Sequence, residues 1–174
     1  MEIRIVSIRA KKKIQEYRDN GWEVIDVTSK SKSRFSPFYP HGMIPIPAME
    51  GKTSASVEGI WQGLKLFPDK DIDLSKFKIT NMKNIKRTGS HVIGHKYGDE
   101  IIDYITARKK IYIPSYFYIL ENYLQDDLNE LIKHKKLILL DYDTNDNIEN
   151  TSKPLSHASI IRDYLQSYSD KLII

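Results

Sequence analysis

The sequence predicts a single α+β domain that is mainly helical and contains a small sheet. Its 174 residues show no repeat and no long linker, which suits one domain with one core. Apolar residues alternate with polar ones near the N-terminus and form a short continuous run at Lys136–Leu140, as expected of strands. Longer segments repeat apolar residues at helical spacing. We expect one domain over 1–174, in which a strand–helix–strand extension (1–28) precedes a core (29–174).

The N-terminal extension is expected to hold two strands and a helix. Alternation predicts a strand over Ile3–Ile8, and Lys11–Asp19 follows as a short helix that Asn20-Gly21 ends. A second strand is expected over Trp22–Thr28. Strand, helix and strand in such close succession indicate an α/β unit whose two strands can pair in parallel.

A proline-rich loop over Ser29–Gly51 follows the extension. Its four prolines and Gly42 rule out a regular helix. Its side chains are too apolar and aromatic for a disordered spacer, so we expect the loop to pack as a wall. These side chains are Phe35, Phe38, Tyr39, His41, Met43 and Ile44.

Periodicity and capping residues predict the remaining elements. In chain order they are a helix over 54–67 capped by Ser54 or Ser56, a loop over Asp69–Phe77, helices over Asp99–Lys110 and Ser115–His134, a buried strand over Lys136–Leu140, a polar loop, and a last helix from near Pro154.

Composition excludes several classes of function. The chain has no cysteine, which excludes disulfides, thiolate zinc sites and a cysteine nucleophile. Its five histidines are scattered along the chain, and no glycine-rich nucleotide loop is present, so no metal and no cofactor are expected. No apolar run approaches the roughly 18–20 residues of a membrane helix, and no signal sequence is seen. We expect a protein of the bacterial or infected-host cytoplasm, without membrane contact.

The charge is mildly basic. Lysine and arginine exceed aspartate and glutamate by 27 to 23, and the pI is about 9.0. The basic runs could meet phosphates or be solvated faces, and both interpretations stay open. These runs are Arg9–Lys13, Lys30–Arg34, Lys83–Arg87 and Arg108–Lys110.

The segment "TSASVEGIWQGLKLF" at 53–67 is the strongest candidate for a functional helix. At 100° per residue it presents three neighbouring stripes. The stripes are an apolar one (Val57, Ile60, Leu64, Phe67), a polar and aromatic one (Glu58, Trp61, Gln62, Lys65), and a glycine one (Gly59, Gly63). The glycine stripe predicts close approach of another backbone. The polar stripe suits either a surface helix with a solvated Glu58, or a cleft in which Trp61 stacks on a flat ligand and Lys65 meets a phosphate.

Several motifs carry a family resemblance over nearly the whole chain. "SPFYPHG", "SVEGIWQGLK", "ARKKIYIPSY", "LLDYDTN" and "PLSHA" resemble an uncharacterised family of phage and bacterial proteins. More distantly, their order is similar to the NADAR family, N-glycosidases that act on ribosides and remove ADP-ribose from guanine. That resemblance implies a NADAR-like core, no cofactor, and a nucleotide-like or ADP-ribosyl small molecule, or ADP-ribosylated nucleic acid, as partner.

The resemblance to the NADAR family also implies functional residues. Glu58 falls on the family's functional glutamate, and Gln62 and Lys65 fall on its "Q-A-x-K-F" ending. Phe38 matches the aromatic of an "F-S-N-F" loop, and Asp146 stands where the family has a functional aspartate. The family's "W-G" after that aspartate and its "N-x-L-G" are missing, and Gly59 stands in place of a histidine.

The chemistry of N-glycoside cleavage assigns roles to these residues. A carboxylate, Glu58, can stabilise an oxocarbenium-like ribose or activate water, and Asp146 or Asp141 can hold ribose hydroxyls or share the water. The substrate-binding candidates are Phe38, Tyr39 and Trp61 for the base, Lys65 and Arg87 for phosphate, and Gln62, Asp141 and His157.

Each binding candidate has a structural alternative. Phe38 and Tyr39 can be core residues beneath the proline loop, Arg87 can pair with a surface carboxylate, and His157 can bond to backbone in a first helical turn. Two rival functions stay open as well: a binding protein that sequesters a nucleotide signal without cleaving it, and a basic nucleic-acid-binding or structural phage protein.

Overall fold

Two units make up the chain in the computed structural model, which describes residues 1–171 and their side chains as far as Ser167. Unit 1 consists of Met1–Ser36 and the residues from Leu120 on, and unit 2 is Pro37–Ile119. The sequence expectation of an extension over 1–28 before a core over 29–174 divides the chain differently. Residues 1–28 belong to the same unit as the C-terminal segment.

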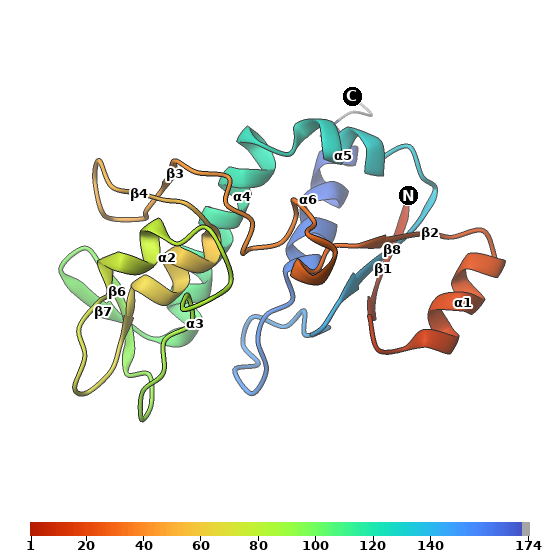
Figure 1. Cartoon of the computed structure of the whole chain (residues 1–174). Coiled ribbons are helices and arrows are strands. Elements are labelled where there is room, and N and C mark those ends of the chain that lie inside the picture. The colour runs from red at the N-terminus through yellow and green to blue at the C-terminus, as the bar shows by residue number, and fades with distance from the viewer. Residues whose placement is uncertain (172–174) are drawn as a thin grey trace. The chain divides into compact units, whose positions relative to one another are not determined.

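Unit 1 is built on a parallel sheet in which β8 lies between β1 and β2 (Figure 1). Ile3 pairs with Leu137, and Glu23 pairs with the same residue from the other side. The elements of unit 1 are β1 (Glu2–Ser7), α1 (Lys11–Asp19), β2 (Glu23–Asp26), a 3₁₀ turn η1 (Ser29–Ser31), α5 (Gln125–Leu131), β8 (Lys136–Asp141) and α6 (His157–Lys171).

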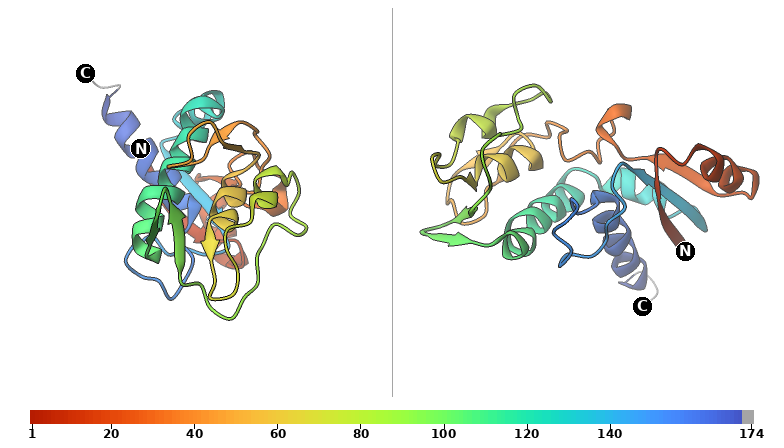
Figure 2. Two further views of the ribbon diagram at one scale, coloured as in Figure 1. Left: turned by 90° about the vertical axis from the view of Figure 1, so that its left-hand side faces the viewer. Right: turned by 90° about the horizontal axis from the view of Figure 1, so that it is seen from below.

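The two faces of this sheet are covered by different helices (Figures 1 and 2). On one face, α1 closes a small core made of Val6, Ile14, Trp22, Ile138 and Leu140. Helix α6 contacts β1 and β8 on the other face, where strand alternation places further buried residues of β8. Because all three strands are parallel, their carboxyl ends share one edge of the sheet.

Unit 2 consists of short helices and two small antiparallel sheets, β3-β4 and β5-β6-β7. Its elements are β3 (Ile44–Pro45), β4 (Thr53–Ser54), α2 (Val57–Gly63), β5 (Lys65–Leu66), a 3₁₀ helix η2 (Leu74–Lys78), β6 (Gly94–Tyr97), β7 (Glu100–Ile102), α3 (Tyr104–Ala107) and a π-helix η3 (Arg108–Tyr112). The boundary between the units falls within α4 (Ile113–Asn122).

The predicted α+β class with small sheets is confirmed, and so are the first strand, the first helix and the buried strand. The expectation that the first two strands pair with each other is wrong, because β8 lies between them. Helix 54–67 is shorter than expected, because the chain leaves Gly63 to form β5 opposite β6.

Three further helices differ from expectation. The segment predicted as a helix over Asp99–Lys110 begins as strand β7, which pairs with β6 across a turn at Gly98 with φ 59°. The segment over Ser115–His134 is two helices, α4 and α5, separated at Tyr123-Leu124. Helix α6 begins at His157 rather than near Pro154.

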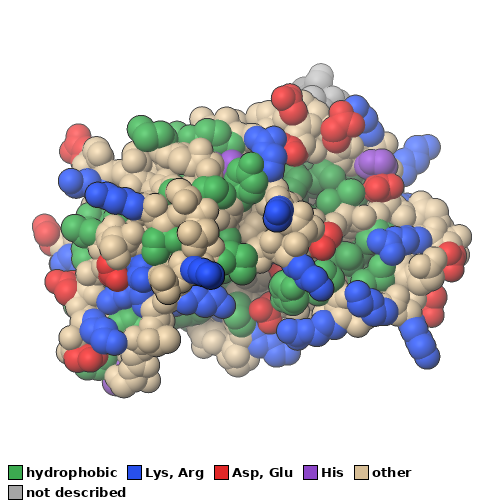
Figure 3. All heavy atoms as spheres, viewed as in Figure 1, with side chains coloured by type: hydrophobic (Ala, Val, Ile, Leu, Met, Phe, Trp, Pro, Cys, Tyr) green, Lys and Arg blue, Asp and Glu red, His purple; other side chains and the backbone are tan. Residues whose placement is uncertain are grey.

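The surface carries charges of both signs. On the face shown in Figure 3, lysine and arginine side chains are interspersed with aspartate and glutamate. This mixture agrees with the small net charge of +4. Within residues 1–171, no helix combines the length and the apolar character that are needed to cross a membrane.

Candidate functional site

Helix α2 begins at a serine cap and is held close to its neighbours by its glycines. Ser56 has extended backbone, and its Oγ accepts a hydrogen bond from Gly59 N at 3.0 Å, the arrangement of a helix N-cap. A Cβ on Gly59 would lie 2.7 Å from the carbonyl oxygen of Lys76, and one on Gly63 would lie 2.3 Å from Phe77 Cε1. The glycine stripe therefore lets η2 pack directly on α2, as the sequence predicted.

Glu58 is a buried carboxylate. It is 8% exposed, so the alternative of a solvated surface carboxylate is wrong. Its backbone nitrogen donates to Pro37 O at 2.8 Å, which ties α2 to the start of the unit. Gln62, 4% exposed and one helical turn later, donates from Nε2 to Glu58 Oε1 at 2.6 Å.

The oxygen of the Gln62 amide is also occupied. It accepts from Lys65 Nζ at 3.1 Å and from the backbone nitrogen of Arg87 at 3.1 Å. Burial lowers the pKa of Lys65, and the nearby charges of Lys86 and Arg87 lower it further, while Glu58 opposes them. In the structure, hydrogen bonds therefore join four of the predicted site residues into one chain: Glu58, Gln62, Lys65 and Arg87.

The Arg87 side chain bonds to backbone rather than to a carboxylate. Its guanidinium donates to the carbonyl oxygens of Lys65 and Asp71, the latter at 2.6 Å from Nη2, and lies 5.0 Å from the centroid of the Phe67 ring. These contacts are with backbone carbonyl oxygens, so they do not support the alternative in which Arg87 pairs with a surface carboxylate. Its expected role in binding phosphate stays a prediction.

Trp61 lies in a cluster of rings. It is 8% exposed, and its ring centroid is 4.0 Å from that of His95, with an angle of 32° between the planes. Tyr104 and Tyr112 meet it edge-on, each at 5.4 Å. Trp61 was expected to stack on a bound base. Because three rings already contact the indole, a base could stack only on the part of it that they leave exposed.

His95 is a fully buried imidazole, and among the described residues neither of its ring nitrogens has a hydrogen-bond partner with good geometry. Burial, and then the nearby charge of Lys65, lower its pKa to about 3 against a smaller opposing effect of the Trp61 backbone, so the ring is neutral at ordinary pH. Unpaired buried polar groups are rare and costly. No role could be assigned to His95 from the sequence, because its position against Trp61 depends on the pairing of β6 with β5.

A π-helix closes the cluster from the other side. Such single turns occur often at functional sites. Within η3, Arg108 is 1% exposed, and its guanidinium carbon lies 4.8 Å from the centroid of the Tyr104 ring. From the sequence, Arg108–Lys110 was interpreted as a basic run. In the structure Arg108 is buried, whereas its neighbours Lys109 and Lys110 are exposed.

The proline loop contributes two half-buried aromatics, Phe38 and Tyr39. The Tyr39 ring lies 4.6 Å from the ring of His41. Gly42 N donates to Ala55 O at 2.9 Å, which fixes the loop beside the start of α2. Neither aromatic is fully buried, so their roles in binding a base stay predictions.

Asp141 and His157 bond to each other in unit 1. Asp141 Oδ2 lies 3.0 Å from His157 Nδ1 and accepts from Ser156 Oγ at 2.7 Å. His157 Nε2 lies 2.8 Å from the carbonyl oxygen of Val27. Burial raises the pKa of Asp141, but the hydrogen bonds and charge of His157 and the bond from Ser156 outweigh it and hold the pKa below its usual value. The alternative of a backbone-bonded His157 is confirmed.

Asp146 belongs to unit 1 as well, where Arg162 Nη1 lies 3.0 Å from its Oδ2. The predicted site residues thus fall into two groups. Unit 2 holds Phe38, Tyr39, Glu58, Trp61, Gln62, Lys65 and Arg87, whereas unit 1 holds Asp141, Asp146 and His157. Among the side chains that the structure describes, which extend to Ser167, no group of three or more histidine, aspartate or glutamate residues could hold a metal ion.

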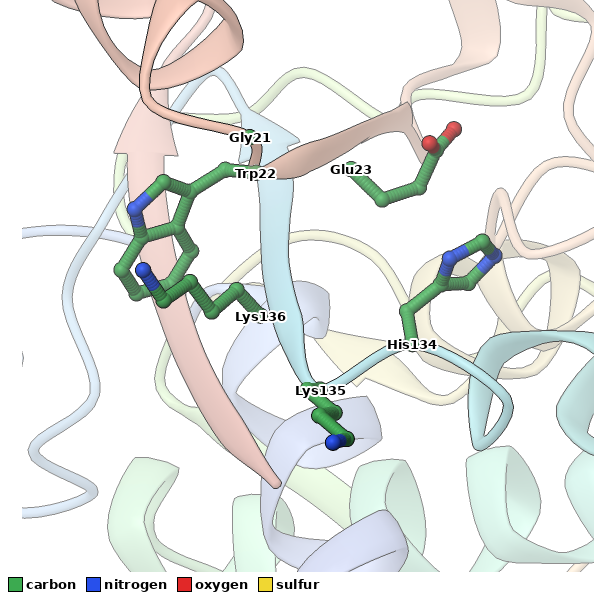
Figure 4. Close-up of a pocket in the computed structure, with 6 residues that line it drawn as sticks. All are labelled: Gly21, Trp22, Glu23, His134, Lys135 and Lys136. Carbon is green, nitrogen blue, oxygen red and sulfur yellow. The ribbon is translucent and has the colours of Figure 1, made fainter.

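A pocket of about 480 Å³ lies in unit 1, at the amino ends of β2 and β8. In Figure 4, Glu23 and His134 extend to one side of the strands, while the side chains of Trp22 and Lys136 lie beside each other on the other. The lining residues are Gly21, Trp22, Glu23, His134, Lys135 and Lys136. None of them is a site residue that the sequence predicted.

Comparison with known proteins places the chain in a family. Residues 7–161 match the model of a family that is described as a family of unknown function (DUF6939). No curated protein matches the chain, and no solved structure matches it. Because the match covers most of the sequence and includes both units, the chain belongs to DUF6939, a family of unknown function.

Proposed function

We propose that the protein is an N-glycosidase that hydrolyses the bond between ribose and a base in an ADP-ribosyl or nucleotide-like substrate. The observation that carries the proposal is the environment of Glu58: a carboxylate that is 8% exposed, held by Gln62, one helical turn from the indole of Trp61. The choice of substrate rests on the resemblance of "SVEGIWQGLK" to the NADAR pattern.

The proposed reaction breaks the bond between C1′ and the base nitrogen. The bonding electrons leave with the base, and C1′ becomes cationic before a water oxygen bonds to it. One proton of that water remains on the new hydroxyl and the other reaches the base. Glu58 is assigned the stabilisation of the cation, because a buried carboxylate acts more strongly on a nearby charge than an exposed one does.

The test is an incubation of the protein with ADP-ribosylated guanine in DNA, with NAD and with cyclic ADP-ribose, followed by chromatography of the ADP-ribose that cleavage of the glycosidic bond releases. Wild type is expected to release it. Glu58→Gln should reduce the rate at least about 100-fold, because it removes the charge while it keeps the size. Glu50→Gln, an exposed change in the same unit, should leave the rate unchanged.

Other outcomes identify the rival functions. Stoichiometric binding of a nucleotide by wild type and Glu58→Gln alike, without product, would replace hydrolysis by sequestration. Binding of unmodified DNA with steep salt dependence, and without nucleotide affinity, would identify a nucleic-acid-binding protein. Either result overturns the glycosidase proposal.

A further inference from the structure

We infer that Gln62 is a positioning residue: Lys65 and the Arg87 backbone lock its amide in one orientation, and the amide in turn holds Glu58 as a fixed carboxylate. From the sequence, Gln62 was expected to bind substrate. The inference about Glu58 is structural, and only its catalytic consequence rests on the proposed function.

The orientation of the amide follows from its partners. Lys65 Nζ and Arg87 N, each 3.1 Å from Gln62 Oε1, are both donors and cannot accept a hydrogen bond. A flipped amide would turn its NH₂ group toward these two donors. Since Gln62 is only 4% exposed, little water can compensate for the lost bonds. The NH₂ group must therefore face Glu58.

The orientation determines which form of Glu58 is favoured. Gln62 Nε2 donates to Glu58 Oε1 at 2.6 Å, and a donor at that distance favours an ionised acceptor over a protonated one. The ammonium of Lys65 acts in the same direction, because its charge attracts that of Glu58, whereas the burial of Glu58, which is 8% exposed, acts against its charge. The hydrogen bond from Gln62 and the ammonium of Lys65 thus favour an ionised Glu58 in spite of its burial.

This arrangement assigns Glu58 one role within the proposed reaction. A carboxylate that is held ionised stabilises a cationic ribose, whereas a general acid needs a carboxyl that keeps its proton near neutral pH. The Lys65 ammonium donates to the Gln62 oxygen and so supports the orientation of the amide, while its expected role in binding phosphate stays a prediction.

The test follows the carboxyl carbon of Glu58 by NMR in protein labelled with ¹³C at glutamate Cδ, with Glu58→Gln to assign the resonance. In Gln62→Glu, two carboxylates face each other, and the midpoint of the Glu58 titration should move up by at least about one pH unit. Lys65→Met removes a donor from the oxygen of the amide and should move the midpoint in the same direction by less. Gln166→Glu, the same change at an exposed position of α6, should not move it.

Two results would overturn the inference: an unchanged midpoint in both variants of the chain, or an equal shift in Gln166→Glu. Melting curves establish which variants fold, and if Gln62→Glu does not fold, Lys65→Met decides alone. The NMR result stands whether or not the protein cleaves a glycoside. If it does, the acidic limb of the rate profile should move with the midpoint, and a profile that stays in place would remove Gln62 from the catalytic mechanism.

Discussion

The imidazole of His157 lies between the carboxylate of Asp141 and a backbone carbonyl. Nδ1 is 3.0 Å from Asp141 Oδ2, and Nε2 is 2.8 Å from the oxygen of Val27. An ionised carboxylate and a carbonyl both accept hydrogen bonds only, so each ring nitrogen must carry a hydrogen. This geometry predicts that His157 is a buried imidazolium. It joins the end of β8, the residue after β2 and the start of α6.

His157→Gln should cost roughly 3–5 kcal/mol in the free energy of unfolding, because it leaves the Asp141 carboxylate buried without its cation. Urea unfolding measures this loss. The double variant with Asp141→Asn should lose less than the sum of the two single variants, because the two residues are in direct contact. Nitrogen-15 NMR of wild type should show both ring nitrogens protonated at pH 7, and a bare ring nitrogen would refute the imidazolium.

Stability should depend on pH through His95. Its pKa is lowered to about 3 in the folded protein, whereas an unfolded histidine titrates near 6.5. Between these values the unfolded chain binds the extra proton, so the free energy of unfolding falls as the pH drops from about 6.5 to about 3. The slope from this residue should approach about 1.4 kcal/mol per pH unit.

The check is a comparison of wild type with His95→Phe in urea between pH 4.5 and 6.5. Phenylalanine can still stack on Trp61, and the substitution removes two unpaired polar atoms. The variant should lose the slope that His95 contributes and should equal or exceed wild type in stability at pH 5. Identical slopes in the two proteins would mean that His95 is not buried and neutral in solution.

Gly63→Ala tests the close packing of η2 on α2. The added methyl group would lie 2.3 Å from Phe77 Cε1, so either the ring or the helix must shift, at a cost of roughly 1–3 kcal/mol. Thermal unfolding measures the cost. Phe77→Leu in the same chain should recover part of it, because leucine leaves room for the methyl group. Wild-type stability in Gly63→Ala alone would disprove the contact.

The sequence predicted those parts of the fold that local patterns determine. Alternation identified β1, and one apolar run identified β8, because each signal lies within a few residues. The insertion of β8 between β1 and β2 depends on pairing between residues more than 100 positions apart, such as Ile3 and Leu137, which no local pattern encodes.

The same distinction holds at the candidate site. Spacing alone predicted the three stripes of the helix at 53–67 and the proximity of Glu58 to Gln62, but it left open whether Glu58 is buried. Spacing could not predict that His95 stacks on Trp61. This contact depends on the pairing of β6 with β5, which brings β6 close to α2. Lys65 was expected on the helix, yet it lies in β5 and still reaches back to Gln62.

Arg87→Lys separates a structural role of Arg87 from phosphate binding. The guanidinium donates to two carbonyl oxygens, those of Lys65 and Asp71, and an ammonium on a flexible chain cannot reproduce this fork. The variant should therefore lose roughly 1–3 kcal/mol in urea unfolding although its charge is unchanged. Lys86→Arg, a change between the same residue types at the exposed neighbouring position, should be neutral. If Arg87 instead binds the phosphates of a substrate, Arg87→Lys will unfold like wild type and will lose affinity for ADP-ribose, which calorimetry would detect.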